Sequence, residues 1–455
     1  KSRVLKAMNL SEDVIGTEIG AAAKNVMGIV AGMLDGCGFN ALKGALMARG
    51  AVPSDWDVTT DARPERVMAL FGERAIPTGL KHGTVTVCAG ETHVEVTTFR
   101  RDGTYSDHRR PDAVQFSSSL EEDLARRDLT VNAMAMDLRE HICDPFGGQE
   151  DLSRRVLRCV GDPLRRLDED ALRIMRTLRF AAVLGFTIEP DTSAALHRRA
   201  PLLADIAAER ILVEMNKLLT GEYMASVLLA YPDVLGVFLP ELLPCVGFDQ
   251  RNVHHCYDVW THSVYAASAI APDAVLRWAM LLHDIGKPGC FTVDEHGTGH
   301  FYGHPARSAE LAEAICRRLR MDKKSAQRIV TLVRWHDRDI PRTEKAVARA
   351  ARQLGEDTLR QLLAVKRADN RAQSPLCRGR AADIDRAEAI LDDLLARQSC
   401  FSLRELAVRG NDLTAMGLRG PAVGEALQKL LDAVMDGSVP NERPALLALA
   451  QKLIQ

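Results

Sequence analysis

The sequence predicts an α+β fold, in which a small α/β head precedes an elongated, all-helical remainder. Residues 84–87 and 93–97 alternate apolar and polar side chains with a period of two around an Ala-Gly turn, which is typical of a β-hairpin. Helices are expected on either side of this hairpin, at residues 64–71 and 119–126. Beyond the Pro-Phe-Gly-Gly turn at 145–148 the apolar period becomes helical, most clearly over residues 168–184.

The composition restricts the class of protein without deciding its partner. A chain of 455 residues with 46% hydrophobic and 26% charged residues has room for about two to four domains with large cores. The formal net charge is only −2, so arginines would have to cluster locally to bind nucleic acid. The ten cysteines form no C-x-x-C pair, which favours free thiols in the cytoplasm. No apolar run reaches the roughly 18 residues of a membrane span.

Two carboxylates stand at the start of the head. Asp55 and Asp57 are two positions apart, and on a strand such residues point to the same side. Carboxylates placed in this way can hold a pair of Mg²⁺ ions, with a third acidic residue from a neighbouring strand. Glu95, in the middle of the hairpin, fits that third position. Taken alone, the Asp-x-Asp pair is better explained by a solvated turn, and Glu95 by an exposed strand residue.

A series of motifs in one order surrounds these carboxylates. It resembles the class II tRNA nucleotidyltransferase/poly(A) polymerase family from about Val52 to the C-terminus. The matching stretches are Asp55–Ala62, Ile76–Val85, Val94–Arg100, Asp123–Met134, Asp144–Gly148 and Glu169–Arg173. The resemblance implies that Asp55, Asp57 and Glu95 bind the catalytic Mg²⁺ ions. It also implies that Arg126, Arg127 and Asp128 contact the ribose and phosphates of the incoming nucleotide.

A second motif of that family suggests how a base is selected. Asp170 and Arg173 are three residues apart on the helix predicted over 168–184, so they are expected to share a face. A carboxylate accepts from the exocyclic amine of C or A, and a guanidinium donates to a ring nitrogen or carbonyl. In the family this pair selects the base, and Arg176 and Arg179 lie near the triphosphate. The alternative is a surface salt bridge worth under about 1 kcal/mol.

The helical part carries a set of ligand-type residues. These residues are His262, His283, Asp284, His304, His336 and Asp369. Together with their spacing they resemble the HD phosphohydrolase superfamily in its two-metal form. Imidazole and carboxylate ligands suit Mn, Fe, Ni or Zn, with Mg as a further option. A metal-bound water would supply hydroxide near neutral pH. Two roles stay open: hydrolysis of 2′,3′-cyclic phosphates or phosphomonoesters at RNA ends, and a purely structural scaffold.

The two resemblances together imply an enzyme that adds C, C and A to tRNA 3′ ends from CTP and ATP. Poly(A) polymerases carry the same head motifs and remain an alternative, as does a phosphohydrolase with an inactive head. The sequence leaves the oligomeric state open. The expected domains are a foreign segment at 1–50, the head at 51–150, a base-binding neck at 151–235, the HD domain at 236–375 and tRNA-binding helices at 376–455.

The first 50 residues depart from the family. Its Gly-Gly-x-x-Arg-Asp turn should place a glycine and an arginine where Leu42 and Ala45 stand. Residues 13–27 instead resemble NAD-dependent glycerol-3-phosphate dehydrogenase, whose catalytic lysine matches Lys24. No G-x-G-x-x-G domain precedes them, so we expect no dehydrogenase activity. We expect a helical segment around 19–33, a missing strand that exposes a sheet edge, and slowed polymerisation.

Overall fold

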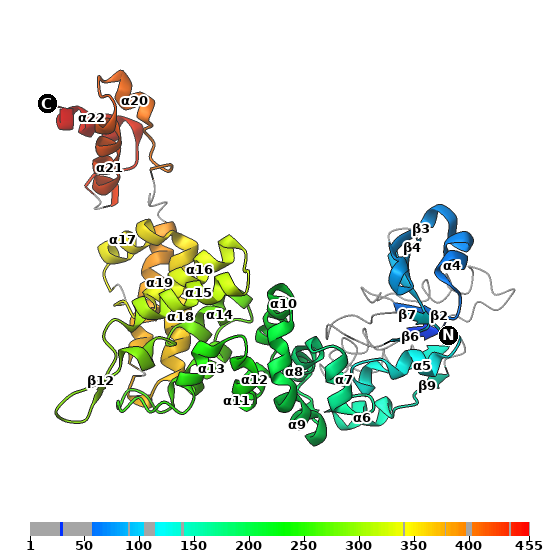
Figure 1. The fold of residues 1–455 in the computed structure, drawn as a ribbon. Coiled ribbons are helices and arrows are strands. Elements are labelled where there is room, and N and C mark those ends of the chain that lie inside the picture. Colours follow the sequence, from blue (N-terminus) through cyan, green and yellow to red (C-terminus); the bar gives the residue numbers. More distant parts are fainter. Residues whose placement is uncertain are drawn as a thin grey trace. The chain divides into compact units, whose positions relative to one another are not determined.

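The computed structural model describes most of the chain after residue 56. The described residues are 28–30, 57–89, 92–103, 114–137, 141–339, 342–377, 379–396, 403–435 and 438–454. The chain divides into two compact units, Lys1–Leu243 and Pro244–Gln455. A small sheet followed by many helices confirms the predicted α+β class (Figure 1). None of the helices described is long and apolar enough to cross a membrane.

The head is built on a seven-stranded sheet in the order β3-β4-β5-β2-β1-β8-β9. Its strands are β1 (Gly28–Val30), β2 (Asp57–Thr60), β3 (Ala75–Gly79), β4 (Thr84–Ala89), β5 (Thr92–Thr98), β8 (Ala135–Asp137) and β9 (Ile142–Cys143). The predicted hairpin is confirmed, because β4 and β5 pair antiparallel with Thr86 opposite Glu95. Helix α4 (Pro64–Phe71), also as predicted, buries Val67 and Phe71 against Val85 and Val96 of the sheet.

The strand order corrects two expectations about the N-terminal segment. Strand β1 pairs parallel with β2 on one side and with β8 on the other, so β2 is not an exposed edge. The helix expected over 19–33 is therefore wrong at residues 28–30. A short apolar run such as Gly-Ile-Val has no period that separates strand from helix, and pairing on both sides decides for the strand. Lys24 lies outside the described residues.

A row of helices completes the first unit. After the small β6–β7 pair (Arg100–Asp102 with Val114–Phe116) come α5 (Leu120–Ala125), α6 (Gly148–Arg154), α7 (Pro163–Glu169), α8 (Leu172–Leu184), α9 (Pro190–Arg199), α10 (Ala208–Thr220), α11 (Met224–Ala230) and α12 (Pro232–Gly236). Ser119 caps α5 by accepting from the backbone N–H of Glu122, which confirms the helix expected at 119–126. The single helix expected over 168–184 is wrong at Asp170, whose extended backbone separates α7 from α8.

Among the described residues of the second unit, the only strands form one short hairpin, β12 (Thr292–Val293) with β13 (Gly299–His300). Its main helices are α13 (Val259–Ser268), α14 (Ala274–Leu282), α15 (His304–Arg318), α16 (Lys323–Trp335), α17 (Glu344–Leu354), α18 (Glu356–Ala372) and α19 (Arg380–Ala396). Helix α18 is central, because it packs against α13, α14, α16, α17 and α19.

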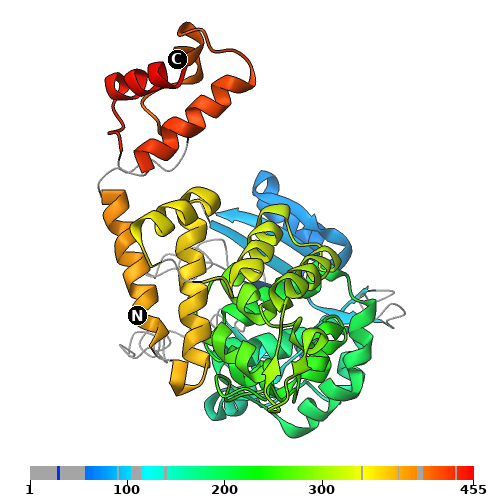
Figure 2. The same cartoon turned by 90° about the vertical axis from the view of Figure 1, so that its left-hand side faces the viewer.

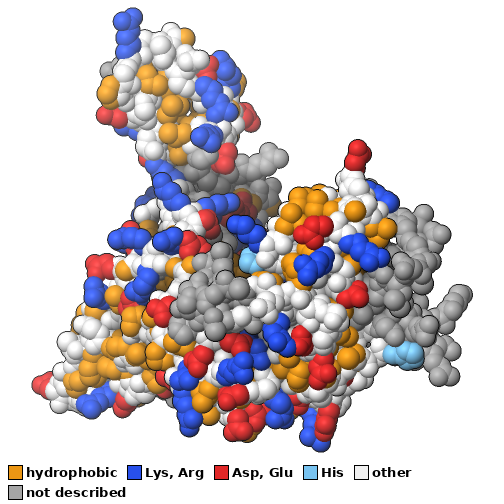
Figure 3. Space-filling model, turned by 45° about the vertical axis from the view of Figure 1, so that its right-hand side comes forward, with side chains coloured by type: hydrophobic (Ala, Val, Ile, Leu, Met, Phe, Trp, Pro, Cys, Tyr) orange, Lys and Arg blue, Asp and Glu red, His pale blue; other side chains and the backbone are white. Residues whose placement is uncertain are grey.

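The last three helices have a small core of their own. They are α20 (Gly410–Ala415), α21 (Pro421–Met435) and α22 (Arg443–Ile454), and Figure 2 shows them gathered together in orange and red. Leu413, Leu430 and Leu446 are buried among them. On the face shown in Figure 3, basic and acidic side chains are interspersed, which agrees with a net charge of only −2.

Candidate active site and metal centre

The acidic positions of the head lie on adjacent strands. Asp57 begins β2, and its Cα is the register partner of Glu95 in the parallel β2–β5 ladder. Glu95 is exposed between the buried Val94 and Val96, so the predicted alternation around it is confirmed. Asp55 lies outside the described residues. The backbone thus brings the second and third carboxylate positions side by side.

The two arginines that end α5 share one buried carboxylate. Arg126 Nη2 lies 2.7 Å from Asp123 Oδ1, and Arg127 Nη2 lies 3.5 Å from Asp123 Oδ2. Asp123 is fully buried and also accepts from the backbone N–H of Arg100, at 3.2 Å. Asp123 was not assigned a role of its own from the sequence. Asp123 precedes the two arginines by three and four residues, and on a helix this spacing predicts that the side chains contact each other.

Asp128 joins the head to the neck. Its Oδ1 accepts from the Leu129 backbone N–H at 2.9 Å and from Asn132 Nδ2 at 3.1 Å, while Arg176 Nη2 lies 2.7 Å from its Oδ2. Burial by itself raises the pKa of Asp128, but the charge of Arg176 and the Asn132 hydrogen bond outweigh it and lower the pKa to about 2. Asp128 is therefore ionised and held entirely by protein groups.

Arg166 and Arg173 fasten the neck to the end of α5. Arg166 Nη2 donates to the carbonyl of Ala125 at 2.7 Å, and Arg173 Nη2 donates to the carbonyl of Arg126 at 2.9 Å. Glu169 Oε2 accepts from both guanidinium groups, at 2.6 and 2.9 Å. Two cations at the carboxyl end of a helix are favourably placed for its dipole. Arg173 thus has three hydrogen-bond partners, namely Glu169 and the carbonyls of Arg126 and Arg166. Glu169 belongs to the quoted motif but was given no role from the sequence.

Asp170 occupies the break between α7 and α8. Its Oδ1 accepts from the Leu172 backbone N–H at 3.1 Å, and Arg210 Nη2 lies 3.6 Å from its Oδ2. Burial raises the pKa of Asp170, and the charge of Arg210 opposes this. The predicted single helix is therefore interrupted at Asp170, which precedes α8, whereas Arg173 lies in the first turn of α8.

Arg179 is turned into the neck. Its Nε lies 2.6 Å from Glu214 Oε2 on α10, and its guanidinium lies 3.9 Å above the Phe180 ring. Only 11% of its side chain is exposed, against 36% for Arg176. Of the two arginines expected near the triphosphate, Arg176 is therefore the more accessible. Glu214 was not identified from the sequence.

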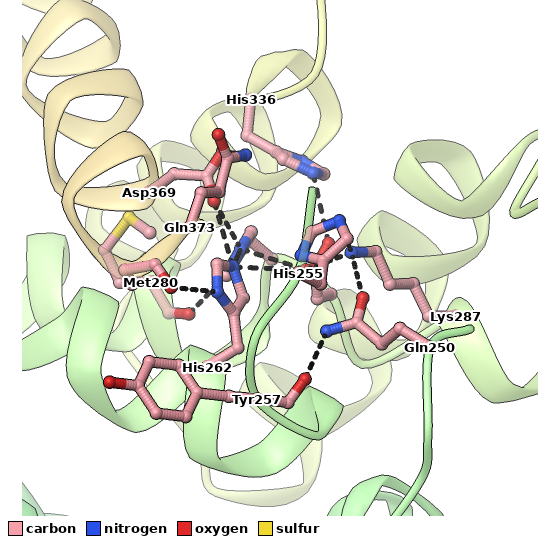
Figure 4. A network of polar contacts seen from close by, with 12 residues as sticks. Gln250, His255, Tyr257, His262, Met280, Lys287, His336, Asp369 and Gln373 are labelled. Carbon is pink, nitrogen blue, oxygen red and sulfur yellow. Dashed lines mark hydrogen bonds and ion pairs between the residues drawn. The ribbon is translucent and has the colours of Figure 1, made fainter. Parts of the chain in front are cut away.

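The six residues predicted for the helical part converge from five elements. His262 lies on α13 and His304 begins α15, while His283 and Asp284 follow α14, His336 follows α16, and Asp369 lies on α18. All but Asp369 are buried. Figure 4 shows His262, His336 and Asp369 directed toward one centre. We call these six residues the histidine cluster.

The histidines of this cluster are fixed in one tautomer. The Nδ1 atoms of His283, His304 and His336 donate to the carbonyls of the residues three positions earlier, at 2.6, 2.8 and 2.6 Å. The Nδ1 of His262 lies 3.3 Å from the carbonyl of Ala372. A neutral imidazole that donates through Nδ1 carries a lone pair on Nε2. The cluster therefore directs its Nε2 lone pairs inward.

The inward lone pairs face each other around one carboxylate. His262 Nε2 lies 3.3 Å from His283 Nε2, and His304 Nε2 lies 3.2 Å from His336 Nε2. Asp284 lies between the pairs, with Oδ2 at 3.3 Å from His283 and Oδ1 at 3.3 Å from His304. Two lone pairs cannot hydrogen-bond to one another, whereas a cation between them binds both. Two three-residue groups that share Asp284 thus fit two metal ions.

The charge of the cluster also suits a cation. Burial opposes protonation of His283, but the charges of Asp284 and Asp369 outweigh it and raise the pKa of His283 to about 10. The ring therefore takes up either a proton or a metal ion at Nε2. His262 Nε2 lies 2.9 Å from Asp369 Oδ1, which completes one side of the cluster.

Three neighbouring side chains were not assigned from the sequence. Lys287 Nζ lies 2.7 Å from Asp284 Oδ2 and donates to Gln250 Oε1 at 2.8 Å. His255 Nε2 lies 3.4 Å from the same ammonium group, and burial together with that charge lowers the pKa of His255 to about 3 (Figure 4). Lys287 follows the His-Asp pair by three residues, and that spacing was the available signal.

Comparisons with known proteins cover both units. Residues 41–158 match the poly A polymerase head domain, residues 185–245 match the probable RNA and SrmB-binding site of polymerase A, and residues 252–373 match the HD domain. A CCA-adding enzyme of Geobacillus stearothermophilus is 36% identical over 400 residues, which cover 87% of each chain. This chain belongs to the CCA-adding enzyme family. Members of this family depend on divalent metal ions, and the HD domain is a metal-binding domain.

Other relatives agree with this assignment. The CCA-adding enzyme of Geobacillus kaustophilus is 52% identical over 194 residues, and that of Geobacillus thermodenitrificans is 51% identical over 233 residues. These two alignments span about half of each relative, 48% and 55%. The crystal structure of the Bacillus stearothermophilus CCA-adding enzyme in complex with CTP superposes with a TM-score of 0.63 at 31% identity, covering 91% of each chain. Residues 13–55 match the C-terminus of NAD-dependent glycerol-3-phosphate dehydrogenase, overlapping the head match.

Proposed function

We propose that this chain is a nucleotidyltransferase that adds C, C and A to the 3′ ends of tRNA, using CTP and ATP. The observation that supports this best is the 36% identity to a CCA-adding enzyme across 87% of both chains. In the reaction the 3′-oxygen of tRNA bonds to the α-phosphorus of the nucleotide, and pyrophosphate leaves. The tRNA substrate would lie in the cytoplasm, and the C-terminal helices are proposed to contact it.

The carboxylates of the head are proposed to hold two Mg²⁺ ions. Asp57 and Glu95 occupy register-matched positions on β2 and β5, and Asp55 is the proposed third ligand. When bound, the ions supply Lewis-acid activation of the 3′-hydroxyl and neutralise the triphosphate. Glu95 is exposed, so it is available to a ligand.

The neck is proposed to bind the incoming nucleotide. Arg126, Arg127 and Arg176 provide the cations for its phosphates, with Asp128 aligning Arg176 through their 2.7 Å contact. Asp170 and Arg173 provide an acceptor and a donor for the base edge. The Glu169 and Arg126 carbonyl contacts hold Arg173 in place before any base arrives, which lowers the entropic cost of binding.

Incorporation of labelled CTP and ATP onto tRNA that lacks its CCA end tests this proposal. We expect incorporation of both nucleotides, more slowly than by an intact relative, because no Gly-Gly-x-x-Arg-Asp turn precedes Asp55 in register. Asp57→Ala should lower the rate roughly 1000-fold, the equivalent of several kcal/mol of lost charge stabilisation. Long A tails without CTP incorporation would point to a poly(A) polymerase instead, and rates equal to those of a relative would show that the turn is dispensable.

The histidine cluster supports a second function, metal-dependent phosphohydrolysis. The opposed Nε2 pairs at 3.2 and 3.3 Å favour this function. Mn, Ni, Fe or Zn are the proposed metals, with 2′,3′-cyclic phosphates or phosphomonoesters at RNA ends as substrates. Release of inorganic phosphate from a phosphomonoester, stopped by a chelator and restored by Mn²⁺ or Ni²⁺, tests it. A domain that acts only as a scaffold would release none.

A further inference from the structure

Two cavities adjoin the histidine cluster and share part of their walls. The smaller, about 210 Å³, is lined by His336 and Asp369 of the cluster and by Arg380. The larger, about 570 Å³, extends from Trp335 along α17 and α18. Arg338, Asp339, Arg342 and Lys366 line both cavities, which therefore form one groove that ends at the cluster. We call it the α17–α18 groove.

The far end of the groove is apolar with polar groups at its side. Ala346, Ala350, Leu359 and Leu363 form its wall, and Thr343 and Gln353 line it too. Trp335 also lines the larger cavity, with the Arg338 guanidinium 4.2 Å from its ring. An apolar wall with a few hydrogen-bonding side chains suits a flat heterocyclic base better than an alkyl chain.

The groove is cationic along its length. Among the described residues, five cationic side chains and three carboxylates line it, and one of those carboxylates is Asp369 of the cluster. In the part of the chain that the structure describes, Arg338, Arg349 and Arg380 have no carboxylate partner. By contrast, Arg360 and Arg367 on α18 lie 2.7 and 2.8 Å from carboxylate oxygens. Unpaired arginines beside a metal-binding cluster favour an anionic ligand.

Lys366 fixes the shape of the groove where it meets the cluster. Its Nζ donates to the carbonyl of His336 at 2.7 Å and to the carbonyl of Arg338. The same helix, α18, presents Asp369 to the cluster one turn later. The position of Arg338 is thus tied through one buried ammonium to the position of a cluster ligand.

We propose that the α17–α18 groove binds the nucleoside part of a phosphorylated nucleoside, such as the 3′-terminal residue of an RNA, with its phosphate directed at the histidine cluster. The base would lie against Ala350 and Leu363 with Arg349 donating to its edge, and Arg338, which lines both cavities, would contact the phosphate. This inference rests on the proposed phosphohydrolase function and adds a binding site for the nucleoside of its substrate. Arg349 and Ala350 would then be specificity-determining residues.

Two substitutions test the groove without touching the cluster. Arg349→Glu reverses a cation, and Ala350→Phe fills the apolar end. The substrates are adenosine 2′-monophosphate and glycerol 2-phosphate, which lacks a nucleoside, with the full chain loaded with Mn²⁺ or Ni²⁺. We expect each variant to lower the ratio of the two kcat/KM values at least tenfold, through the KM of the nucleotide. Arg317→Glu, the same charge change at an exposed site off the groove, should leave the ratio unchanged. An unchanged ratio in both groove variants would overturn the proposal.

Direct binding separates this proposal from the hydrolytic one. If the wild-type chain hydrolyses neither compound, the phosphohydrolase function fails, and calorimetric titration with adenosine 2′-monophosphate then decides the groove alone. At least tenfold weaker binding to Arg349→Glu and Ala350→Phe than to wild type and Arg317→Glu supports it. Equal binding to all four chains overturns the proposal. Binding of decanoate that is abolished only by Ala350→Phe also overturns it, because the groove would then bind an amphipathic acid.

Discussion

The histidine cluster and the head–neck site use charged side chains in opposite ways. In the cluster, Nε2 atoms that carry lone pairs face one another at 3.2 and 3.3 Å, so the arrangement is incomplete without a cation between them. In the head and neck, Arg126, Arg173 and Asp128 already have protein partners at 2.7–2.9 Å. The first site is organised to receive an ion, whereas the second is organised to hold its own geometry.

The two sites also differ in which part of the chain orients their side chains. Three cluster histidines are oriented by carbonyls three residues earlier in their own segments. Arg173 is oriented by the carbonyl of Arg126, 47 residues away, and Arg176 by Asp128, 48 residues away. Local constraints survive changes elsewhere in the fold. The neck site depends instead on the head and neck docking correctly.

The strongest test of the contrast removes one cluster histidine. His283→Ala should reduce the tightly bound transition metal to below a tenth of the wild-type amount, because the remaining ligands no longer surround the ion. Metal content is measured by mass spectrometry after incubation with Mn²⁺ and gel filtration. CTP incorporation should stay within about twofold of wild type if the two sites are independent. His296→Ala, an exposed histidine of the same unit, is the control. If His283→Ala leaves the metal content unchanged, the cluster is not organised to receive an ion, and the difference from the head–neck site does not hold.

The same contrast explains what could be predicted from the sequence. The β4–β5 hairpin and α4 were predictable because alternation and helical spacing are local patterns. The cluster residues were recognisable from their motifs, and local Nδ1 contacts then fix three of the four rings. The break at Asp170 was missed because the apolar period continues across it, although Asp often precedes a helix start.

Other features depend on contacts that no local pattern contains. Strand β1 was expected to be helix, and only its pairing with β2 and β8 identifies it as a strand. The ion pair of Arg179 with Glu214, on a helix far along the chain, has no local sequence pattern either. The α17–α18 groove likewise arises from packing between helices and has no sequence signature.

A smaller effect is expected at the base-selecting position. Asp170→Ala should reduce the preference for CTP over UTP about 10- to 100-fold, because the acceptor for the exocyclic amine is lost. Competing incorporation of the two nucleotides onto tRNA lacking its CCA end measures this preference. Asp168→Ala removes a carboxylate that is 41% exposed and binds Arg199, and it should leave the preference unchanged. If both variants behave alike, Asp170 serves only to start α8.

The smallest effect concerns the stability of the head–neck junction. Asp128→Asn removes the charge that Arg176 faces and should lower the free energy of unfolding by about 2 kcal/mol, the scale of a hydrogen bond to a charged group. The folded pKa of Asp128 is lowered to about 2 from an ordinary value of 3.8. Its stabilising contribution is therefore complete above pH 3.8 and disappears as the pH falls through 2. Urea denaturation should show a constant difference between wild type and variant from pH 5 to 8, shrinking below pH 4. Asp168→Asn, at a more exposed pair, should cost under about 1 kcal/mol. A difference that instead grows on acidification would mean that the junction is held by groups other than this ion pair.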